Sequence, residues 1–197
     1  MYKVYGTIRS RALRVLWMLE EIGEAYEFVE AGSHSKEVLA LNPSGKVPIL
    51  EVEGAVITDS TAILTYLADK HGKLTHPAGT VSRAHQDGLT FALLDEFDSV
   101  LWTATRHKFY LPEDQRAENV IPSLEWEFER HLTRMSRRFA GPFLMGDEMT
   151  IADIICAHCL NWAKNMKFPI LPENLEVYRN QMTQRRAFRA VLALANN

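Results

Sequence analysis

The feature that most constrains the fold of this chain is a change of pattern near residue 75. Before this point, short β-prone runs alternate with amphipathic helical runs, and after it only helical periodicity remains. The expected order in the first part is β-α-β-α-β-β-α. This order implies a mixed sheet, because a β-α-β unit joins parallel strands and a tight hairpin joins antiparallel ones. The sequence therefore predicts an α/β domain followed by an all-α domain.

Turn and cap residues set the expected boundaries of the elements. We expect strands at 2–5, 26–29, 47–52 and 55–58, helices at 11–22, 36–41, 60–72, 82–107, 117–139 and 150–164, and one or two more helices within 175–194. Gly23 and Gly72 follow helical runs, where glycine often caps a helix. Residues 76–81 contain a proline and a glycine and no apolar period. They are interpreted as a linker between domains at 1–75 and 82–197.

The composition limits the classes of partner and of site. A net charge of -3 gives no basic surface for nucleic acid and no attraction to a membrane surface, so neither partner is expected. No apolar run approaches the roughly 18 residues of a membrane-spanning helix. The chain has two cysteines, Cys156 and Cys159, which suits a reducing compartment and predicts a cytoplasmic protein. They lie mid-helix among apolar residues without a second ligand pair, so we expect a buried core pair and no metal site.

Four motifs follow one another along the chain: SRALRVLWMLEE at 10–21, LNPSGKVPIL at 41–50, TDSTAI at 58–63, and FLMGD followed by TIAD within 143–153. Taken in this order, they resemble the cytosolic glutathione transferase family. Each motif is weak alone, but their order and spacing along nearly the whole chain are specific. The last one also reads as a helix-capping box, in which Thr150 and Asp153 satisfy each other's backbone groups.

The resemblance implies a thioredoxin-like, glutathione-binding domain at 1–75 and an all-helical domain at 82–197 that carries the electrophile. The implied activity is that of a glutathione transferase, which activates the glutathione thiolate for attack on a hydrophobic electrophile. No cysteine precedes Cys156, which favours the serine- or tyrosine-type classes of bacterial members over the cysteine-type classes. Two alternatives stay open: a non-catalytic binding or scaffold protein, and a glutathione-dependent peroxidase or isomerase on the same fold.

Two pairs of residues are candidates for binding glutathione, one pair its backbone and the other its γ-glutamyl end. The resemblance implies a cis bond between Val47 and Pro48, which would turn the Val47 backbone toward an extended peptide as an added strand. Base rates alone favour a trans proline at the start of a strand. Asp59 and Ser60 stand at a helix N-terminus, where they can hold the γ-glutamyl carboxylate and ammonium or act only as a cap.

Three basic residues are candidates for the glycyl carboxylate. Lys46 fits the family pattern directly, whereas His34 fits only with a gap of one residue. Arg11, at the start of the first helix, can also reach a carboxylate of glutathione. The alternative is that His34 lies in an exposed loop and that Arg11 is a solvated helix residue.

Three hydroxyls compete to donate a hydrogen bond to the sulfur. Ser10 stands just before the first helix, as in the serine-type classes, and its alternative role is an ordinary N-cap. Tyr5 ends the first strand and fits the tyrosine-type classes with a small gap, and its alternative role is a half-buried strand residue. Thr7 is a further candidate. The sequence favours Ser10 and does not decide between the three.

The electrophile is expected beside the long helix at 82–107. Four residues at the end of this helix are candidates for lining the electrophile pocket: Trp102, Arg106, Phe109 and Tyr110. The alternative is that they pack in the helical core. The resemblance also implies a homodimer that pairs through the same helix and the partner's N-terminal domain. The acidic residues Asp95, Glu96 and Asp98 on this helix are candidates for reaching the glutathione of the partner subunit.

Overall fold

The computed structural model describes residues 1–196, apart from the side chains of residues 118 and 196. Its internal contacts divide the chain into two units. The first unit joins Met1–Ala78 to the C-terminal segment that begins at Thr183, and the second unit is Gly79–Met182. The first boundary falls inside the expected linker. The C-terminal segment differs from the expected division, which assigned it to the helical domain.

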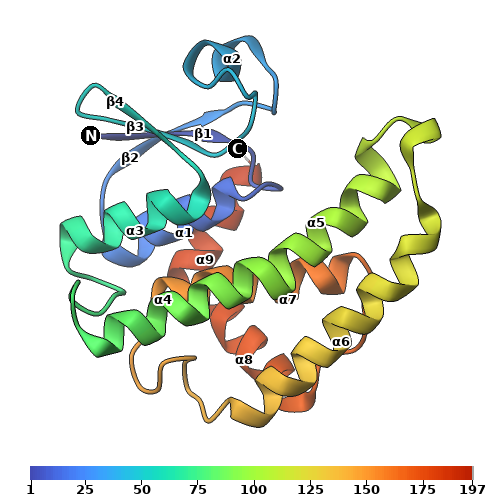
Figure 1. The fold of residues 1–197 in the computed structure, drawn as a ribbon. Helices are drawn as coiled ribbons and strands as arrows, with labels where there is room; N and C mark the ends of the chain where they lie inside the picture. Colours follow the sequence, from blue (N-terminus) through green and yellow to red (C-terminus); the bar gives the residue numbers. More distant parts are fainter. Residues whose placement is uncertain (197) are drawn as a thin grey trace. The chain divides into compact units, whose positions relative to one another are not determined.

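A four-stranded mixed sheet forms the centre of the first unit (Figure 1). Its strands are β1 (Tyr2–Gly6), β2 (Tyr26–Glu30), β3 (Ile49–Val52) and β4 (Ala55–Thr58), in the order β2-β1-β3-β4. β1 pairs in parallel with β2, and the β1–β3 and β3–β4 pairs are antiparallel. The β-α-β start and the hairpin therefore produce the mixed sheet that the sequence predicted.

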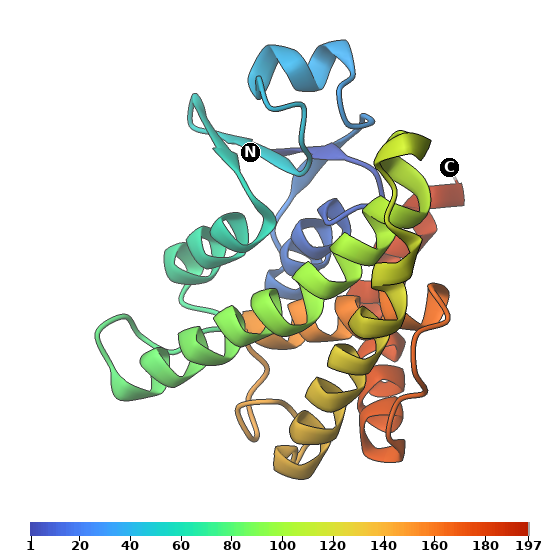
Figure 2. The same ribbon diagram turned by 45° about the vertical axis from the view of Figure 1, so that its right-hand side comes forward.

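Three helices cover the two faces of this sheet. They are α1 (Ala12–Ile22), α2 (Lys36–Leu41) and α3 (Ser60–His71). α1 and α3 lie together against one face, and α2 lies on the other (Figures 1 and 2). Side chains of β1 alternate between these faces, so that Tyr5 joins Val38 of α2 and Ile49 of β3 in a small apolar cluster.

The C-terminal segment packs against α1, which explains its place in the first unit. Its helix α9 (Arg186–Ala193) brings Phe188 edge-on to Trp17, with 4.8 Å between ring centroids. Arg185 donates to both carboxylate oxygens of Glu21, at 2.6 and 2.8 Å. Trp17 is completely buried. The apolar face of α1 is therefore covered partly by a segment about 170 residues away along the chain, a contact that local sequence patterns do not reveal.

Helices make up most of the second unit. They are α4 (Val81–Leu93), α5 (Ser99–Thr105), α6 (Ile121–Arg138), α7 (Ile151–Asn165) and α8 (Glu173–Gln184), the last of which ends just past the unit boundary. α4 and α5 form one continuous green helix in Figure 2. This run corresponds to the long helix predicted at 82–107, but it contains two π-helical turns, η1 (Leu94–Asp98) and η2 (Arg106–Tyr110).

α7 is the buried centre of this unit. Its first turn has the predicted capping box, in which the Thr150 N–H donates to Asp153 Oδ2 at 2.8 Å. Cys156 and Cys159 form no disulfide and are completely buried, and burial raises the pKa of Cys156. The described part of the chain contains no cluster of three or more His, Cys, Asp or Glu residues suited to a metal ion. Within the same part, no helix is both long and apolar enough to cross a membrane.

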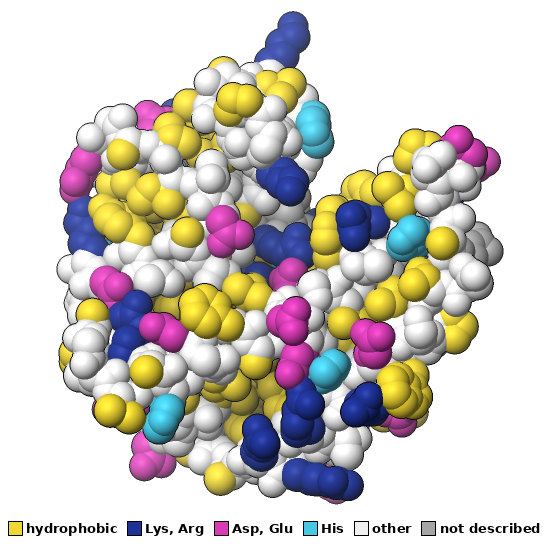
Figure 3. Space-filling view, in the orientation of Figure 1, with side chains coloured by type: hydrophobic (Ala, Val, Ile, Leu, Met, Phe, Trp, Pro, Cys, Tyr) yellow, Lys and Arg dark blue, Asp and Glu magenta, His cyan; other side chains and the backbone are white. Residues whose placement is uncertain are grey.

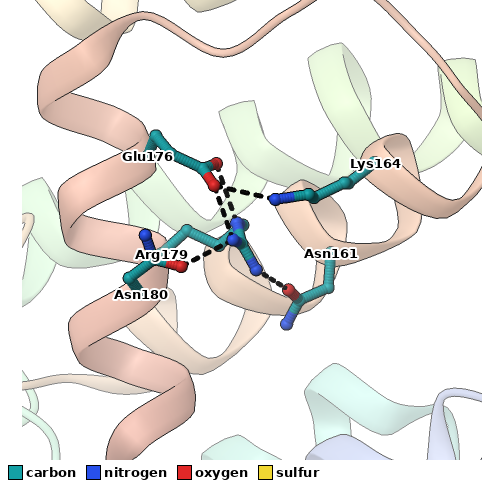
Figure 4. Close-up of polar contacts among 5 residues, drawn as sticks. All are labelled: Asn161, Lys164, Glu176, Arg179 and Asn180. Carbon is teal, nitrogen blue, oxygen red and sulfur yellow. Dashed lines mark hydrogen bonds and ion pairs between the residues drawn. The ribbon is translucent and has the colours of Figure 1, made fainter.

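A network of charges joins α7 to α8 (Figure 4). Glu176 accepts hydrogen bonds from Arg179 at 2.7 and 2.9 Å and from Lys164 at 2.8 Å. Arg179 also donates to Asn161 and Asn180. Arg179 and Lys164 together lower the pKa of Glu176 from 4.5 to about 2.

The lowered pKa predicts that acid weakens this network. The ionised Glu176 stabilises the fold above pH 4.5, and this contribution is lost as the pH falls toward 2. The side chain of Glu176 is 33% exposed, so solvent screening limits its contribution to about 1 kcal/mol. Urea unfolding should show Glu176→Gln less stable than wild type near neutral pH, with the difference narrowing as the pH falls. Glu173→Gln, an exposed residue of α8, should show no such pH-dependent difference, and a constant difference for Glu176→Gln would contradict the account.

Candidate functional site

The strand register gathers the predicted glutathione contacts at one end of the sheet. Tyr5 near the end of β1 pairs with Ile49 at the start of β3, and Ile49 also pairs with Thr58 at the end of β4. The loop after β1, the segment before β3 and the start of α3 therefore leave the sheet at the same edge. The end of β2 lies there too, since Gly6 pairs with Glu30.

The peptide bond between Val47 and Pro48 is cis, as the resemblance implied. The segment immediately after it enters β3, and the Val47 side chain packs against the apolar cluster around Tyr5. No hydrogen bond between described residues uses the N–H or C=O of Val47. These two backbone groups are therefore available to an extended ligand.

Asp59 and Ser60 begin α3, and each has one hydrogen-bonding capacity that the described residues leave unused. Asp59 has a positive φ of 72°, and its Oδ1 accepts from the N–H groups of Thr61 and Ala62 at 2.8 and 3.1 Å. Its Oδ2 accepts from no described residue. A positive φ outside glycine is strained, and such residues cluster at ligand sites.

Arg14 of α1 lies behind the Ser60 hydroxyl. Its Nη1 donates to Ser60 Oγ at 3.4 Å, and both side chains are buried. The Ser60 O–H itself donates to no acceptor within the described residues. A buried guanidinium, a free O–H and the N-terminal end of α3 together favour an anion at this point.

His34 and Lys46 lie in two loops that touch each other. The His34 N–H donates to Gly45 C=O at 2.8 Å, and a Cβ on Gly45 would come within 2.3 Å of the His34 ring. Gly45 also has a φ of 68°, so both conformation and space require glycine there. This contact brings His34 to the residue that precedes Lys46, and both basic side chains are exposed. Arg11 precedes α1 and is half-buried.

The three candidate hydroxyls have different surroundings. Ser10 Oγ donates to Thr7 C=O at 2.7 Å and accepts from Ala12 N–H at 3.1 Å, so it binds the first residue of α1. Tyr5 is buried and its O–H donates to Glu51 at 2.9 Å. Burial and Glu51 raise the pKa of Tyr5. The Thr7 hydroxyl has no hydrogen-bond partner among the described residues.

The turn from β1 to α1 places Ser10 beside Val47. A Cβ built on Gly6 would lie 3.5 Å from Ser10 Oγ and 3.6 Å from Val47 Cβ, so both side chains flank the same glycine. Tyr5 belongs to the apolar cluster beneath α2, against which the Val47 side chain also packs. The hydrogen bonds separate the two hydroxyls: that of Tyr5 is bound to the Glu51 carboxylate, whereas Ser10 Oγ lies at Gly6 and donates to a backbone carbonyl.

Two residues of this region were absent from the sequence interpretation. Arg14 is a charged residue inside a helical run whose other members are nearly all apolar, and that placement was an available signal of a buried charge. Glu51 alternates with apolar residues along β3, as an exposed strand residue would. Its bond with Tyr5 depends on sheet register, so no local signal indicates it.

The candidate electrophile residues lie at the end of the α5–η2 run in the second unit. Trp102 and Tyr110 have ring centroids 5.6 Å apart, and the guanidinium of Arg106 lies 5.9 Å from the Trp102 ring. Phe109 and Tyr110 are 63% and 70% exposed. These two aromatic side chains therefore do not belong to the helical core, which was the alternative interpretation for them.

The three acidic residues on the long helix that are candidates for reaching the partner subunit differ in exposure. Glu96 pairs with Arg134 and His131 of α6 within its own unit. Asp98 is buried, whereas Asp95 is exposed. Only Asp95 thus has both an exposed side chain and no such pairing with α6 among the described residues.

Comparisons with known proteins show which family the chain belongs to. Residues 9–70 match the family model of the glutathione S-transferase N-terminal domain. The chain is also 31% identical over 163 residues to a maleylacetoacetate isomerase of Rhizobium meliloti, an alignment that covers 74% of this chain and 73% of that relative. The chain belongs to the glutathione S-transferase family. This family membership confirms the resemblance on which the sequence analysis relied.

Other family relatives differ in length and in function. A probable elongation factor 1-gamma 2 of Arabidopsis thaliana is 32% identical over 166 residues, which cover 80% of this chain. The chain spans only 39% of that relative's length. Among solved structures, a theta class glutathione S-transferase of Xanthomonas axonopodis pv. citri with glutathione bound is 25% identical, has a TM-score of 0.76, and aligns over 96% of this chain and 95% of its own.

Proposed function

We propose that this protein is a glutathione transferase that binds glutathione at the sheet edge of its first unit and activates the thiol for attack on an electrophile. The observation that carries the proposal is the convergence at that edge of three groups whose hydrogen-bonding capacity the described residues leave unused. They are the N–H and C=O of Val47, the O–H proton of Ser60 and Oδ2 of Asp59. The solved relative with bound glutathione supports the choice of ligand.

Each part of the tripeptide has a matching group. The cysteinyl backbone pairs with the N–H and C=O of Val47 as an added strand. The γ-glutamyl carboxylate accepts a hydrogen bond from the Ser60 O–H at the N-terminus of α3, with the Arg14 charge behind it. The γ-glutamyl ammonium donates to Asp59 Oδ2. Lys46, with His34 or Arg11 as alternatives, binds the glycyl carboxylate.

The Ser10 hydroxyl is the proposed donor to the sulfur. A free thiol has a pKa of about 8.5, and lowering it by about two units requires about 2.7 kcal/mol of preference for the thiolate. One or two charge-assisted hydrogen bonds of about 1.5–3 kcal/mol each supply this amount. Ser10 now donates to the Thr7 carbonyl, and a thiolate is the stronger acceptor, so the proton turns to the sulfur when glutathione binds. The dipole of α1 acts in the same direction.

The second unit supplies the proposed electrophile contacts. Trp102, Arg106, Phe109 and Tyr110 present aromatic surface and one cation, two of them largely exposed. In the reaction, the thiolate forms a carbon–sulfur bond and the electrophile loses its leaving group or takes up a proton. The residues of the first unit hold and activate the nucleophile.

An isomerase is the second candidate, favoured by the relative from Rhizobium meliloti. It would use the same glutathione site, but glutathione would add to the substrate and leave again. Consumption of glutathione separates the two reactions. A non-catalytic role, as the elongation-factor relative suggests, predicts binding without either reaction.

The surface of α4 and α6 supports a homodimer, which we also propose. Val81 and Phe91 of α4 and Trp126 of α6 are large hydrophobic side chains that are exposed. Figure 3 shows a hollow over these two helices with hydrophobic side chains in its floor and basic side chains beside it, and Leu89 and Met135 are among its lining residues. Pairing through α4 would cover this apolar surface.

Replacing Ser60 tests the binding site. Ser60→Ala removes the proposed donor to the γ-glutamyl carboxylate, so calorimetry should show glutathione binding weakened by about tenfold. Binding of cysteinylglycine, which lacks the γ-glutamyl group, should change by less than about twofold. Ser82→Ala, which removes an exposed serine from the first turn of α4, is the matched control and should change neither ligand. An equal loss for both ligands, or wild-type binding no tighter for glutathione than for the dipeptide, would contradict the site.

A further inference from the structure

Arg106 stands within an aromatic group at the end of the long helix. Trp102, Arg106 and Tyr110 follow one another at intervals of four residues, and η2 contributes the last two of them. The guanidinium carbon lies 5.9 Å from the centre of the Trp102 ring, and that ring lies 5.6 Å from the Tyr110 ring. π-helical turns such as η2 are frequent at functional sites. The group therefore presents flat aromatic surface and a positive charge together.

The charge of Arg106 has no partner of opposite sign among the described residues. Its one hydrogen bond runs from Nη2 to Thr103 Oγ1, at 3.4 Å. Its Nε is shielded from solvent and donates to no acceptor in the described part of the chain. A guanidinium offers five N–H donors in a planar fork, and here most of them are unused. Another arginine of the same unit, Arg130, also stacks on a tryptophan, but its side chain is exposed.

An aromatic surface beside a free guanidinium selects a particular kind of molecule. A planar conjugated ligand stacks on the rings, and a carboxylate accepts two parallel hydrogen bonds from the guanidinium fork. An uncharged ligand would cover Arg106 without satisfying its donors, which disfavours neutral hydrophobic compounds. The exposed side chain of Tyr110 leaves the group accessible from solvent.

We propose that the electrophile of this enzyme is a planar, conjugated compound that carries a carboxylate, and that Arg106 binds this carboxylate. The proposal rests on the proposed transferase function and narrows its substrate class. Arg106 is a specificity-determining residue in this account, and Trp102 and Tyr110 bind the conjugated body. The reacting carbon then lies on the same flat body, away from the anchored carboxylate.

The test uses binding, so that it does not depend on turnover. Two unreactive probes, 3,5-dinitrobenzoate and its methyl ester, share one ring and differ in charge. Calorimetry on the full chain should show wild type binding the carboxylate about tenfold more tightly than the ester, as expected for a charge-assisted contact. Arg106→Gln should bring this ratio to about one, and Arg106→Lys should restore it only in part, because lysine lacks the fork.

Arg130→Gln is the matched control, since it removes the same charge from another arginine–tryptophan pair of this unit and should keep the wild-type ratio. Equal affinities for the two probes in wild type, a ratio unchanged in Arg106→Gln, or no binding of either probe would each overturn the proposal. Conversion of 4-chloro-3,5-dinitrobenzoate by glutathione, in which sulfur displaces chloride, is measured on the same samples. Selective binding without conversion would refute the transferase function while leaving the carboxylate site in place.

Discussion

With glutathione saturating, Ser10→Ala is expected to raise the midpoint of the pH profile of kcat/KM for the electrophile by about one to two pH units, because the bound thiolate loses one charge-assisted hydrogen bond. At a pH below the wild-type midpoint, the rate should fall about ten- to hundredfold. Ser10 also accepts from the Ala12 N–H, so the variant loses this hydrogen bond at the start of α1 as well. Loss of one such bond lowers stability by about 1 kcal/mol but does not change the pKa of a bound thiol. The pH profile therefore separates activation from folding.

Two companion variants identify the donor. Tyr5→Phe removes a hydroxyl that is bound to Glu51, so it should leave the midpoint of the profile in place. Thr7→Val removes a hydroxyl that has no partner among the described residues. If Thr7→Val shifts the midpoint and Ser10→Ala does not, Thr7 is the donor and the assignment of Ser10 is wrong.

Asp153→Ala is expected to lower the free energy of unfolding by about 3–5 kcal/mol, the largest effect on stability that the structure predicts. Asp153 is completely buried, and its carboxylate accepts from the N–H groups of Thr150 and Leu144 and from the Tyr178 hydroxyl, at 2.8, 2.9 and 2.9 Å. Alanine leaves all three donors without this acceptor at the start of α7. Urea unfolding measures the loss.

Two further variants serve as an intermediate case and as a control for this loss of stability. Asp153→Asn keeps the size and one acceptor oxygen, so its loss should fall between those of wild type and Asp153→Ala. Asp147→Ala removes an exposed acidic residue from the preceding loop and should change the free energy of unfolding by less than about 0.5 kcal/mol. Equal, small losses for Asp153→Ala and Asp147→Ala would show that the capping network does not stabilise the fold.

Local signals in the sequence predicted most of the fold. The bounds of α2 agree with those predicted, since a serine cap and an Asn-Pro pair enclose it. β4 and α7 also begin or end within a residue of the expected positions. Hydrophobic period, caps and turns are encoded in neighbouring residues, which is why they can be recognised from one sequence.

Contacts between distant residues could not be predicted in this way. The packing of Phe188 on Trp17 moves the C-terminal segment into the first unit, and no periodicity in either helix specifies the other as its partner. The bond from Arg14 to Ser60 joins residues 46 positions apart. The two π-helical turns also escaped prediction, because their residues continue an ordinary helical pattern.

The sequence predicted which residues form the candidate site better than it predicted the role of each residue. The family resemblance supplied Val47, Pro48, Asp59 and Ser60, and sheet register brings these residues to one edge. The choice among hydroxyls depends on hydrogen-bond partners, which the sequence does not show. Ser10 and Tyr5 both carry a suitable group, and only the structure shows that the Ser10 hydroxyl binds backbone groups at the start of α1 while the Tyr5 hydroxyl binds Glu51.

The central claim is that the first unit binds glutathione and stabilises its thiolate. The most direct test is the ultraviolet absorbance of thiolate, recorded against pH for glutathione bound to the wild-type protein. We predict a midpoint about two units below the value of about 8.5 for a free thiol. A midpoint equal to that of free glutathione, or no bound glutathione at any pH, would contradict the account and leave a transferase fold with another role.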